Sequence, residues 1–313
     1  MLAFVSKRVA MALVIVLATI AIAFLLVHLV PGSPGQIILG PGASAAAIHA
    51  ENAKLGWNAP LVNQFGHYLG QLLRGRLGYS VIDGSSVGSD LAARLPVTAG
   101  IALGATILSA LVGIVAGVQA AVRGGFLDRA VTASAGLSIS LPAFWVGILL
   151  VWLFAVKLHL LPATGYVSFA TSPLQWARSL ALPVLTLSIG AVAALARQTR
   201  SSMLAALGRE HIRTLQALGT PRWRVRYIHA LRSASVPVVS VLGLQFIGLF
   251  GSTIVIEQIF ALPGLGQAAQ TAIGNHDFPT VEALVIVSTI VVVLVNLVLD
   301  LVLLVLDPRV RTR

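Results

Sequence analysis

A few polar side chains stand in or beside long apolar stretches of this sequence, where burial makes them costly. Asp300 and Asn296 lie one helical turn apart within the last apolar stretch, and Glu257 follows an earlier one. An ionisable group in a hydrocarbon environment marks a transport pathway, a proton relay or a satisfied structural pairing. We therefore take Asp300, Asn296 and Glu257 as candidate intramembrane or gate residues. Glu257 also suits a helix end, and His28 suits a hydrogen-bonded position at the membrane interface.

Catalytic and metal chemistry have little support in the sequence. There is no cysteine, and no two of the seven histidines are four or fewer residues apart, so a local chelating pattern is missing. No serine-hydrolase elbow, no His-Glu-x-x-His helix and no phosphate-binding loop of the Gly-x-x-x-x-Gly-Lys-Ser/Thr type occurs. We expect no catalytic residue, no cofactor and no metal site in this chain, which cannot hydrolyse ATP by that route.

The composition predicts that lipid covers most of the protein. Of 313 residues, 57% are hydrophobic and only 10% are charged, and the mean hydropathy is +0.93. A soluble domain carries about 25% charged residues. Six stretches are long enough to cross a bilayer as helices. They are Val9–Val30, Val97–Val122, Val131–Val156, Leu180–Ala196, Val236–Ile256 and Val281–Leu306. We predict an all-α polytopic membrane protein with about six transmembrane helices.

The distribution of basic residues predicts the orientation. If the N-terminus is inside, 15 of the 21 Lys and Arg residues lie in cytoplasmic segments. Positively charged residues accumulate on the cytoplasmic side of membrane proteins. Both termini are therefore predicted to be cytoplasmic, and the juxtamembrane position explains the net charge of +11 without nucleic acid.

Three regions follow from this topology. Residues 1–30 form the N-terminal segment with the first span, and residues 31–96 form an extracytoplasmic domain. Residues 97–313 form the membrane core, with a cytoplasmic loop at 197–235. In the outer domain, helices are expected around Ser44–Leu55 and Pro60–Leu73.

The cytoplasmic loop is basic and has the pattern of two helices joined by a turn. A helix is predicted over Leu204–Gly219, because apolar or amphipathic residues recur there at near-helical spacing. These residues are Leu204, Leu207, His211, Leu215 and Leu218. Gly219 and Pro221 are typical of a helix stop. A second helix then runs from Pro221 towards Pro237, and a helical hairpin of this kind suits docking on a soluble partner.

Small residues recur at four-residue spacing within two of the spans. Gly100 with Gly104 and Gly113 with Gly117 are predicted to let neighbouring helices approach closely. The fifth span contains three further glycines, Gly243, Gly248 and Gly251. Internal packing is the favoured interpretation, and a flexible or pore-facing wall is the alternative.

Several motifs carry a family resemblance. The loop reads Glu210-His211-Ile212-Arg213-Thr214-Leu215-Gln216-Ala217-Leu218-Gly219, and His229-Ala230-Leu231-Arg232 and Pro237 follow. Other matching runs are Leu72-Leu73-Arg74-Gly75-Arg76-Leu77-Gly78, Pro142-Ala143-Phe144-Trp145-Val146-Gly147 and Pro263-Gly264-Leu265-Gly266. In this order they resemble permeases of the dipeptide/oligopeptide/nickel group of ABC importers, over nearly the whole chain. The outer domain is similar to that of the first of the two permeases in such systems.

The resemblance implies a type I ABC-importer permease in a bacterial or archaeal plasma membrane. It implies that the chain forms half of a pathway for di- and oligopeptides, and that the complete pathway works by alternating access. The implied partners are a second homologous permease, two cytoplasmic ATPase subunits that bind ATP and Mg, an extracytoplasmic substrate-binding protein and membrane lipid.

Within the loop, the resemblance places Glu210, Ala217 and Gly219 on the coupling helices that fit a groove on the ATPase. His229, Leu231 and Pro237 belong to the same matched loop. One position departs from the family, because Leu218 stands where a basic residue is frequent. This departure concerns one polar contact at the docking surface.

Three alternatives remain open at this level. A permease of the same architecture could carry nickel, glutathione or another small solute. A membrane-embedded enzyme would need two reactive groups at matching depth, and Asp300 has no evident partner in the sequence. An autonomous channel has no use for the basic helical loop.

Overall fold

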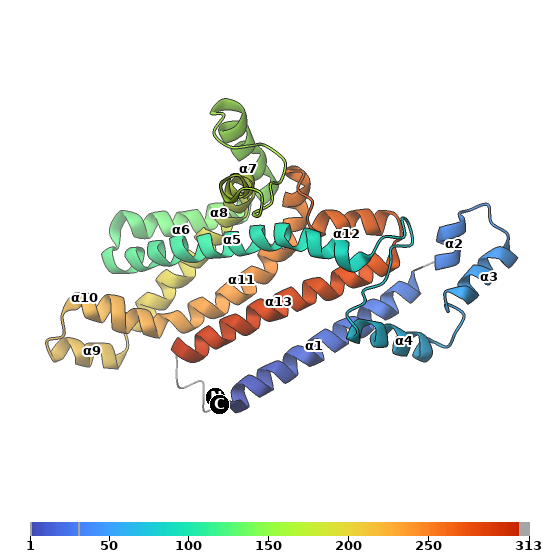
Figure 1. Cartoon of the computed structure of the whole chain (residues 1–313). Coiled ribbons are helices and arrows are strands. Elements are labelled where there is room, and N and C mark those ends of the chain that lie inside the picture. Colours follow the sequence, from blue (N-terminus) through green and yellow to red (C-terminus); the bar gives the residue numbers. More distant parts are fainter. Residues whose placement is uncertain (1, 31, 307–313) are drawn as a thin grey trace. The chain divides into compact units, whose positions relative to one another are not determined.

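The computed structural model describes residues 2–30 and 32–306. Within them the chain is built of helices and turns, with one antiparallel bridge between Tyr79 and Ser86 (Figure 1). The helices are α1 (Leu2–Leu29), α2 (Pro34–Leu39), α3 (Ala45–Lys54), α4 (Leu61–Leu73), α5 (Val87–Arg123), α6 (Gly125–Ser140), α7 (Ala143–Leu150), α8 (Pro173–Leu207), α9 (Glu210–Ala217), α10 (Arg222–Arg224), α11 (Leu231–Ile259), α12 (Leu265–Gly274) and α13 (Phe278–Leu306). Two π-helical segments are η1 (Val151–Lys157) and η2 (Val225–Ala230).

Five helical segments of the described chain are long and apolar enough to span a membrane. They are Ser6–Leu29, Val87–Arg123, Pro173–Leu207, Arg222–Ile259 and Phe278–Leu306. Each contains or closely matches one of the predicted spans, so the prediction of an all-α polytopic protein is confirmed. The number of membrane crossings and the cytoplasmic position of both termini stay predictions.

The third predicted span, Val131–Val156, is not a single helix. Helix α6 ends at Ser140, and a new helix begins at Ala143 and continues through η1 to Lys157. Pro142 is extended between them, with φ −61° and ψ 135°. Proline lacks the amide donor of a helix interior and disfavours helical geometry in the residue before it. The apolar helix Ala143–Lys157 is therefore shorter than the five long ones.

Serine residues start several helices of the chain. The hydroxyl of Ser33 accepts a hydrogen bond from the Gln36 amide, and Ser44 accepts one from the Ala47 amide, both at 3.3 Å. Ser172 caps α8 in the same way and Pro173 follows it. Such caps satisfy amide groups that have no partner within the helix. The expected helices around Ser44–Leu55 and Pro60–Leu73 are confirmed as α3 and α4.

The chain divides into two compact units. The first consists of Met1–Pro96 with Gly264–Val293, and the second of Val97–Pro263 with Leu294–Arg313. Sequence reasoning did not associate Gly264–Val293 with the N-terminal residues, because the two stretches are far apart along the chain. Helix α12 was not foreseen either.

His28 holds α1 against α4 within the first unit. Its Nδ1 lies 2.8 Å from the Phe24 carbonyl and its Nε2 lies 3.0 Å from Gln64 Oε1. The imidazole also stacks on Trp57, with ring centroids 4.2 Å apart. The prediction of a hydrogen-bonded histidine is confirmed.

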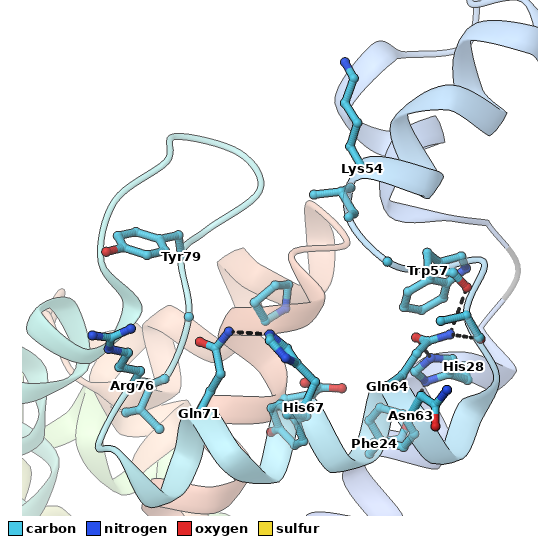
Figure 2. A pocket seen from close by; sticks show the side chains of 18 residues that line it. Phe24, His28, Lys54, Trp57, Asn63, Gln64, His67, Gln71, Arg76 and Tyr79 are labelled. Atoms are coloured by element: carbon cyan, nitrogen blue, oxygen red, sulfur yellow. Dashed lines mark hydrogen bonds between the residues drawn. The ribbon is translucent and has the colours of Figure 1, made fainter.

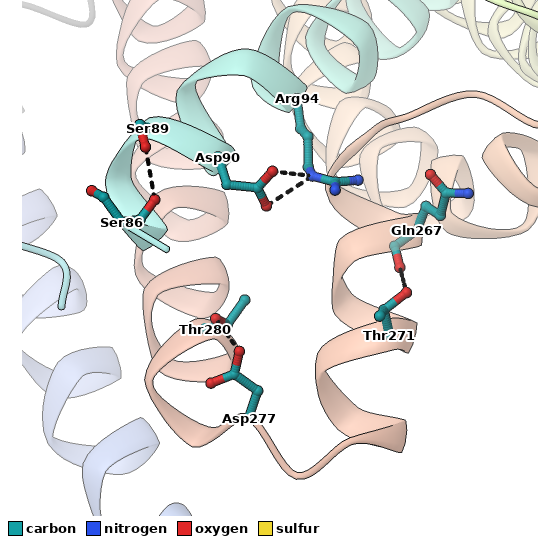
Figure 3. A network of polar contacts seen from close by, with 8 residues as sticks. All are labelled: Ser86, Ser89, Asp90, Arg94, Gln267, Thr271, Asp277 and Thr280. Atoms are coloured by element: carbon teal, nitrogen blue, oxygen red, sulfur yellow. Dashed lines mark hydrogen bonds and ion pairs between the residues drawn. The ribbon is translucent and has the colours of Figure 1, made fainter. Parts of the chain in front are cut away.

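A second polar group in this unit joins the turn after α12 to the 79–86 segment. Figure 3 shows the Asp277 side chain of this turn bonded to Thr280. The Asp277 carboxylate accepts hydrogen bonds from the Thr280 hydroxyl at 2.7 Å and from the Val81 amide at 3.2 Å. Asp277 is buried, so these bonds satisfy a charge that would otherwise be costly. Asp90 and Arg94 form a separate, more exposed pair one turn apart on α5.

Helix α8 is the centre of the second unit, where it packs against α6, α7 and α11. Glycines of α5 also meet it: a Cβ on Gly113 would lie 3.1 Å from the Val192 carbonyl, and one on Gly117 only 2.4 Å from that of Ala196. The predicted close approach is therefore confirmed for this pair. Around Gly248 and Gly251 of α11, by contrast, no atom of another described element lies within 4 Å of the place that a Cβ would take.

Candidate docking site

The loop at residues 197–235, which is predicted to be cytoplasmic, contains a helical hairpin (Figure 1). Helix α8 ends at Leu207, Gly208 and Arg209 form a break, and α9 covers Glu210–Ala217. After a turn the chain resumes at Arg222 and continues through η2 into α11. The predicted single helix over Leu204–Gly219 is wrong in this respect, because the break at Gly208 divides it.

Gly219 ends α9 in the way that its position in the sequence predicts. Its φ is +76°, a backbone conformation that glycine adopts without steric strain. The Gly219 amide donates to the Gln216 carbonyl at 3.0 Å, and the Thr220 amide donates to the Leu215 carbonyl at 3.0 Å. This pair of hydrogen bonds is the Schellman motif. The helix therefore ends sharply before Pro221.

Ile212 anchors α9 to the rest of the second unit. Its side chain is fully buried and belongs to an apolar cluster with Met203 of α8 and Val225 of η2. Leu215 packs against the same cluster. His211 Nε2 also lies 3.4 Å from the Ser233 hydroxyl of α11. A short helix held from several sides can move together with α8 and α11.

The buried face of α9 differs from the predicted apolar stripe, the set of residues whose near-helical spacing predicted the helix. These are Leu204, Leu207, His211, Leu215 and Leu218. Leu204 and Leu218 are exposed, and Ile212, which lies outside that stripe, is the buried residue. The break at Gly208–Arg209 changes the direction of the helix, so the spacing in α8 does not carry over into α9. Only Leu207 and Leu215 of the stripe contact the cluster.

The free face of the hairpin combines apolar and basic side chains. Leu218 is 77% exposed and Trp223 is 56% exposed. The Arg224 guanidinium lies over the Trp223 ring, 5.3 Å from its centroid. Further exposed basic residues of this segment are Arg209, Arg213 and Arg222. Exposed apolar groups surrounded by cations suit a protein surface that carries acidic residues.

The predicted loop residues fall on two sides of this hairpin. Glu210 is the first residue of α9, and Ala217 and Gly219 lie at its end, all exposed. His229 is half-buried in η2, and Leu231 packs against the Ile212 cluster. Pro237 is exposed within α11, beyond the hairpin itself.

Glu257 lies in the core of the second unit. Its side chain is fully buried near the end of α11, and its Oε1 accepts a hydrogen bond of 2.6 Å from the Thr98 hydroxyl of α5. The Thr98 side chain is buried as well. This geometry ties two helices together, which neither the gate nor the simple helix-end interpretation of Glu257 foresaw.

Asn296 and Asp300 are half-buried on α13. A Cβ on Gly243 of α11 would lie 2.8 Å from Asn296 Oδ1. The amide side chain therefore occupies the space that this glycine leaves, and Asp300 follows one turn further along the same helix.

An ion pair between α6 and α8 was not identified from the sequence. The guanidinium of Arg200 donates to both carboxylate oxygens of Asp128. The Arg200 hydrogen bond holds the pKa of Asp128 below its usual range. The two residues are 72 positions apart, so no sequence spacing indicated the pair.

Two family models cover this chain. The binding-protein-dependent transport system inner membrane component matches residues 88–312, and the N-terminal membrane component of the same systems matches residues 1–102.

Similar proteins span the full length. A protein of Brucella abortus (strain 2308), named as the permease of a peptide transport system, is 41% identical over 312 residues, 99% of each chain. A Sinorhizobium fredii protein named as a peptide ABC transporter permease is 38% identical over 289 residues, 92% of each chain. The glutathione transport system permease protein GsiC of Escherichia coli is 34% identical over 312 residues, 99% of each chain.

Proposed function

The chain belongs to the inner-membrane components of binding-protein-dependent transport systems, and on that premise we propose that it forms half of a pathway for di- and oligopeptides. Its family is one of transport components rather than enzymes. The names of the Brucella and Sinorhizobium relatives support the peptide cargo.

The observation that carries this proposal is the anchored hairpin of α9, α10 and η2. Its outer face is basic and partly apolar, while Ile212 fixes its inner face to the membrane helices. Two soluble ATPase subunits, which hold the ATP and Mg, dock one on each permease and move this element. The motion alternates the pathway between inward-open and outward-open states.

Roles follow for the residues of the hairpin. Glu210, Ala217 and Gly219 touch the ATPase, because they lie on the exposed rim of α9. His229, Leu231 and Pro237 connect the contact to α11. In the membrane core, Glu257 holds α11 to α5 through Thr98, and Asn296 and Asp300 contribute to the packing or the lining of the pathway.

The complete assembly contains two further kinds of subunit. A second homologous permease forms the other half of the pathway, and a substrate-binding protein delivers cargo from outside. Residues 31–96 face the outside, both termini and residues 197–235 face the cytoplasm, and lipid surrounds the spans. No nucleic acid takes part.

Gentle extraction of a tagged chain from its native membrane tests this assembly. We expect ATPase subunits and a second permease to co-purify, and peptide uptake by the reconstituted complex to require ATP. Gly219→Leu should leave membrane insertion intact and abolish substrate-stimulated ATP hydrolysis. Purification of a lone chain, under conditions that preserve other complexes, would contradict the proposal.

Glutathione is the second candidate cargo, because a full-length relative is named for its transport. Uptake of a labelled tripeptide into proteoliposomes should fall when unlabelled peptides compete and should not fall with excess glutathione. Competition by glutathione alone would identify it as the cargo while retaining the same architecture.

A further inference from the structure

A cavity of about 590 Å³ lies within the first unit (Figure 2). Its walls come from α1, the loop after α3, helix α4, the segment around Tyr79 and the start of α13. Small-molecule sites in proteins have volumes of about 300–1,000 Å³. The cavity is therefore large enough for a small organic ligand, and nothing in the proposed transport cycle uses it.

One wall of the cavity is rigid and aromatic. Trp57 is stacked on His28 with an angle of 8° between the ring planes, and Gln64 binds the carbonyl groups of Trp57 and Ala59, each at 2.8 Å. Phe24 packs beneath, 5.9 Å from the Tyr68 ring. Because these side chains hold one another, the wall is formed before any ligand arrives. Aromatic faces of this kind attract cations.

The Glu282 carboxylate lines the same cavity. The Glu282 side chain is only 9% exposed, and within residues 2–30 and 32–306 it forms no salt bridge. The basic side chain of this cavity that acts on its charge is His28, whose two ring nitrogens are already engaged with Phe24 and Gln64. The Tyr68 hydroxyl is buried beside it, and burial together with the Glu282 charge raises the pKa of Tyr68 far above its usual range. The hydroxyl therefore stays protonated. A buried carboxylate in this setting is stabilised by an incoming cation.

The rim of the cavity carries the opposite charge. Arg76 and Lys54 line it and are exposed. Lys54 is engaged with Glu51 at 2.9 Å, whereas Arg76 has no ion pair among the residues that the structure describes. Figure 2 shows Arg76 and Tyr79 on the side of the cavity opposite Trp57. A guanidinium in such a position is suited to a carboxylate.

We propose that this cavity binds a small zwitterion of dipeptide size, with its primary ammonium group at Glu282 and its carboxylate at Arg76. The choice of a dipeptide rests on the proposed function, because a peptide importer would meet such ligands on its outer side. The charges themselves define the chemistry: the cavity offers a carboxylate to a cation, a guanidinium to an anion, and an aromatic wall on the side opposite Arg76.

Calorimetry of the purified full chain in lipid nanodiscs tests the site, with alanyl-phenylalanine as the probe. We expect saturable binding that Glu282→Gln weakens about tenfold or more, as for the loss of a charge-paired hydrogen bond. N-acetylation of the probe removes its ammonium group. It should weaken binding to the original protein by the same factor as Glu282→Gln does, and it should cause no further loss of affinity in the Glu282→Gln variant. Equal losses on acetylation in both proteins would overturn the assignment of the ammonium group.

The carboxylate end has its own pair of measurements. Arg76→Gln should weaken binding of alanyl-phenylalanine but not of its C-terminal amide. Asp83→Asn, which removes an exposed acid of the same unit outside this cavity, is the matched control and should change nothing.

A chain that assembles with its ATPases and transports peptides, yet fails to bind the probe in nanodiscs, would overturn this site while leaving the proposed function intact. If Glu282→Gln instead weakens only the docking of the purified substrate-binding protein, the cavity accepts a protein side chain and the small-ligand proposal is wrong.

Discussion

Two helices of the second unit end with the same hydrogen-bond pattern, but different residues make the turn. At the end of α9, Gly219 has φ +76°. At the end of α11, Ala261 has φ +50°, and its amide donates to the Gln258 carbonyl while the Leu262 amide donates to that of Glu257. Alanine in this conformation is strained by about 1–2 kcal/mol, whereas glycine is not.

The difference lies in what surrounds each turn. A Cβ on Gly219 would meet nothing within 4 Å among the described residues. Ala261 stands between Phe260 and Leu262, whose side chains are both almost completely buried. A proline follows two residues after each turn residue, Pro221 in one case and Pro263 in the other, so a local stop signal is present at both ends. Only α9 also has the glycine that the turn favours, whereas tertiary packing holds Ala261 of the α11 end in a conformation that it disfavours.

The largest effect is expected from removing that packing. Phe260→Ala should lower the free energy of unfolding by about 3–5 kcal/mol, because it leaves a cavity in the core and releases the strained turn. Chemical denaturation in detergent would measure it. Phe126→Ala, at a position 83% exposed, serves as the control and should have little effect. Similar values for the two variants would show that the core does not hold this turn.

A smaller effect is expected at the other helix. Ile212→Ala removes the side chain that anchors α9 and should cost about 2–4 kcal/mol, with the loss confined to the hairpin. Hydrogen exchange should increase over Glu210–Ala217 and not in α11. The control is Ile228→Ala, at a position 48% exposed. Uniform acceleration throughout the second unit would contradict local anchoring.

Exchanging the two turn residues sharpens the comparison, because the signs should be opposite. Gly219→Ala should destabilise by about 1 kcal/mol, and Ala261→Gly should stabilise by up to about 1 kcal/mol. Unfolding midpoints of the two single variants and of the pair would measure this. Effects of the same sign would mean that φ is not the property that distinguishes the turns.

The smallest effect concerns the ion pair between α6 and α8, which involves neither turn. Because the folded-state pKa of Asp128 is lowered, its stabilisation is present above the unfolded pKa and is lost as pH falls through the folded value. Because the folded-state pKa lies below the ordinary aspartate value, the original protein should lose this tie only at pH values below that ordinary value. In Asp128→Asn the free energy of unfolding should depend less on pH in this acidic range. Asp83→Asn retains the Asp128–Arg200 pair and should still show the loss of stability that comes from Asp128. Identical profiles for the original protein and Asp128→Asn would exclude this pair as a source of the pH dependence.

Helix prediction worked where the signals were local. Ser44 and the stretch after Pro60 indicated α3 and α4, and Gly219 with Pro221 indicated the end of α9. It was wrong for Val131–Val156, because hydropathy does not register the break that Pro142 introduces. The predicted stripe around His211 was misplaced for a similar reason, since the break at Gly208 resets the helical phase.

The sequence alone was sufficient for the membrane class, the long apolar helices, the helical hairpin and the resemblance to the family. These depend on composition, period and turn residues, which act over a few positions. Other features became visible only in three dimensions. They include the burial of Glu257 against Thr98, the Asp128–Arg200 pair and the union of residues 264–293 with the N-terminal unit. Each joins residues that are far apart along the chain, and contacts at that separation are set by how the helices pack rather than by any local pattern.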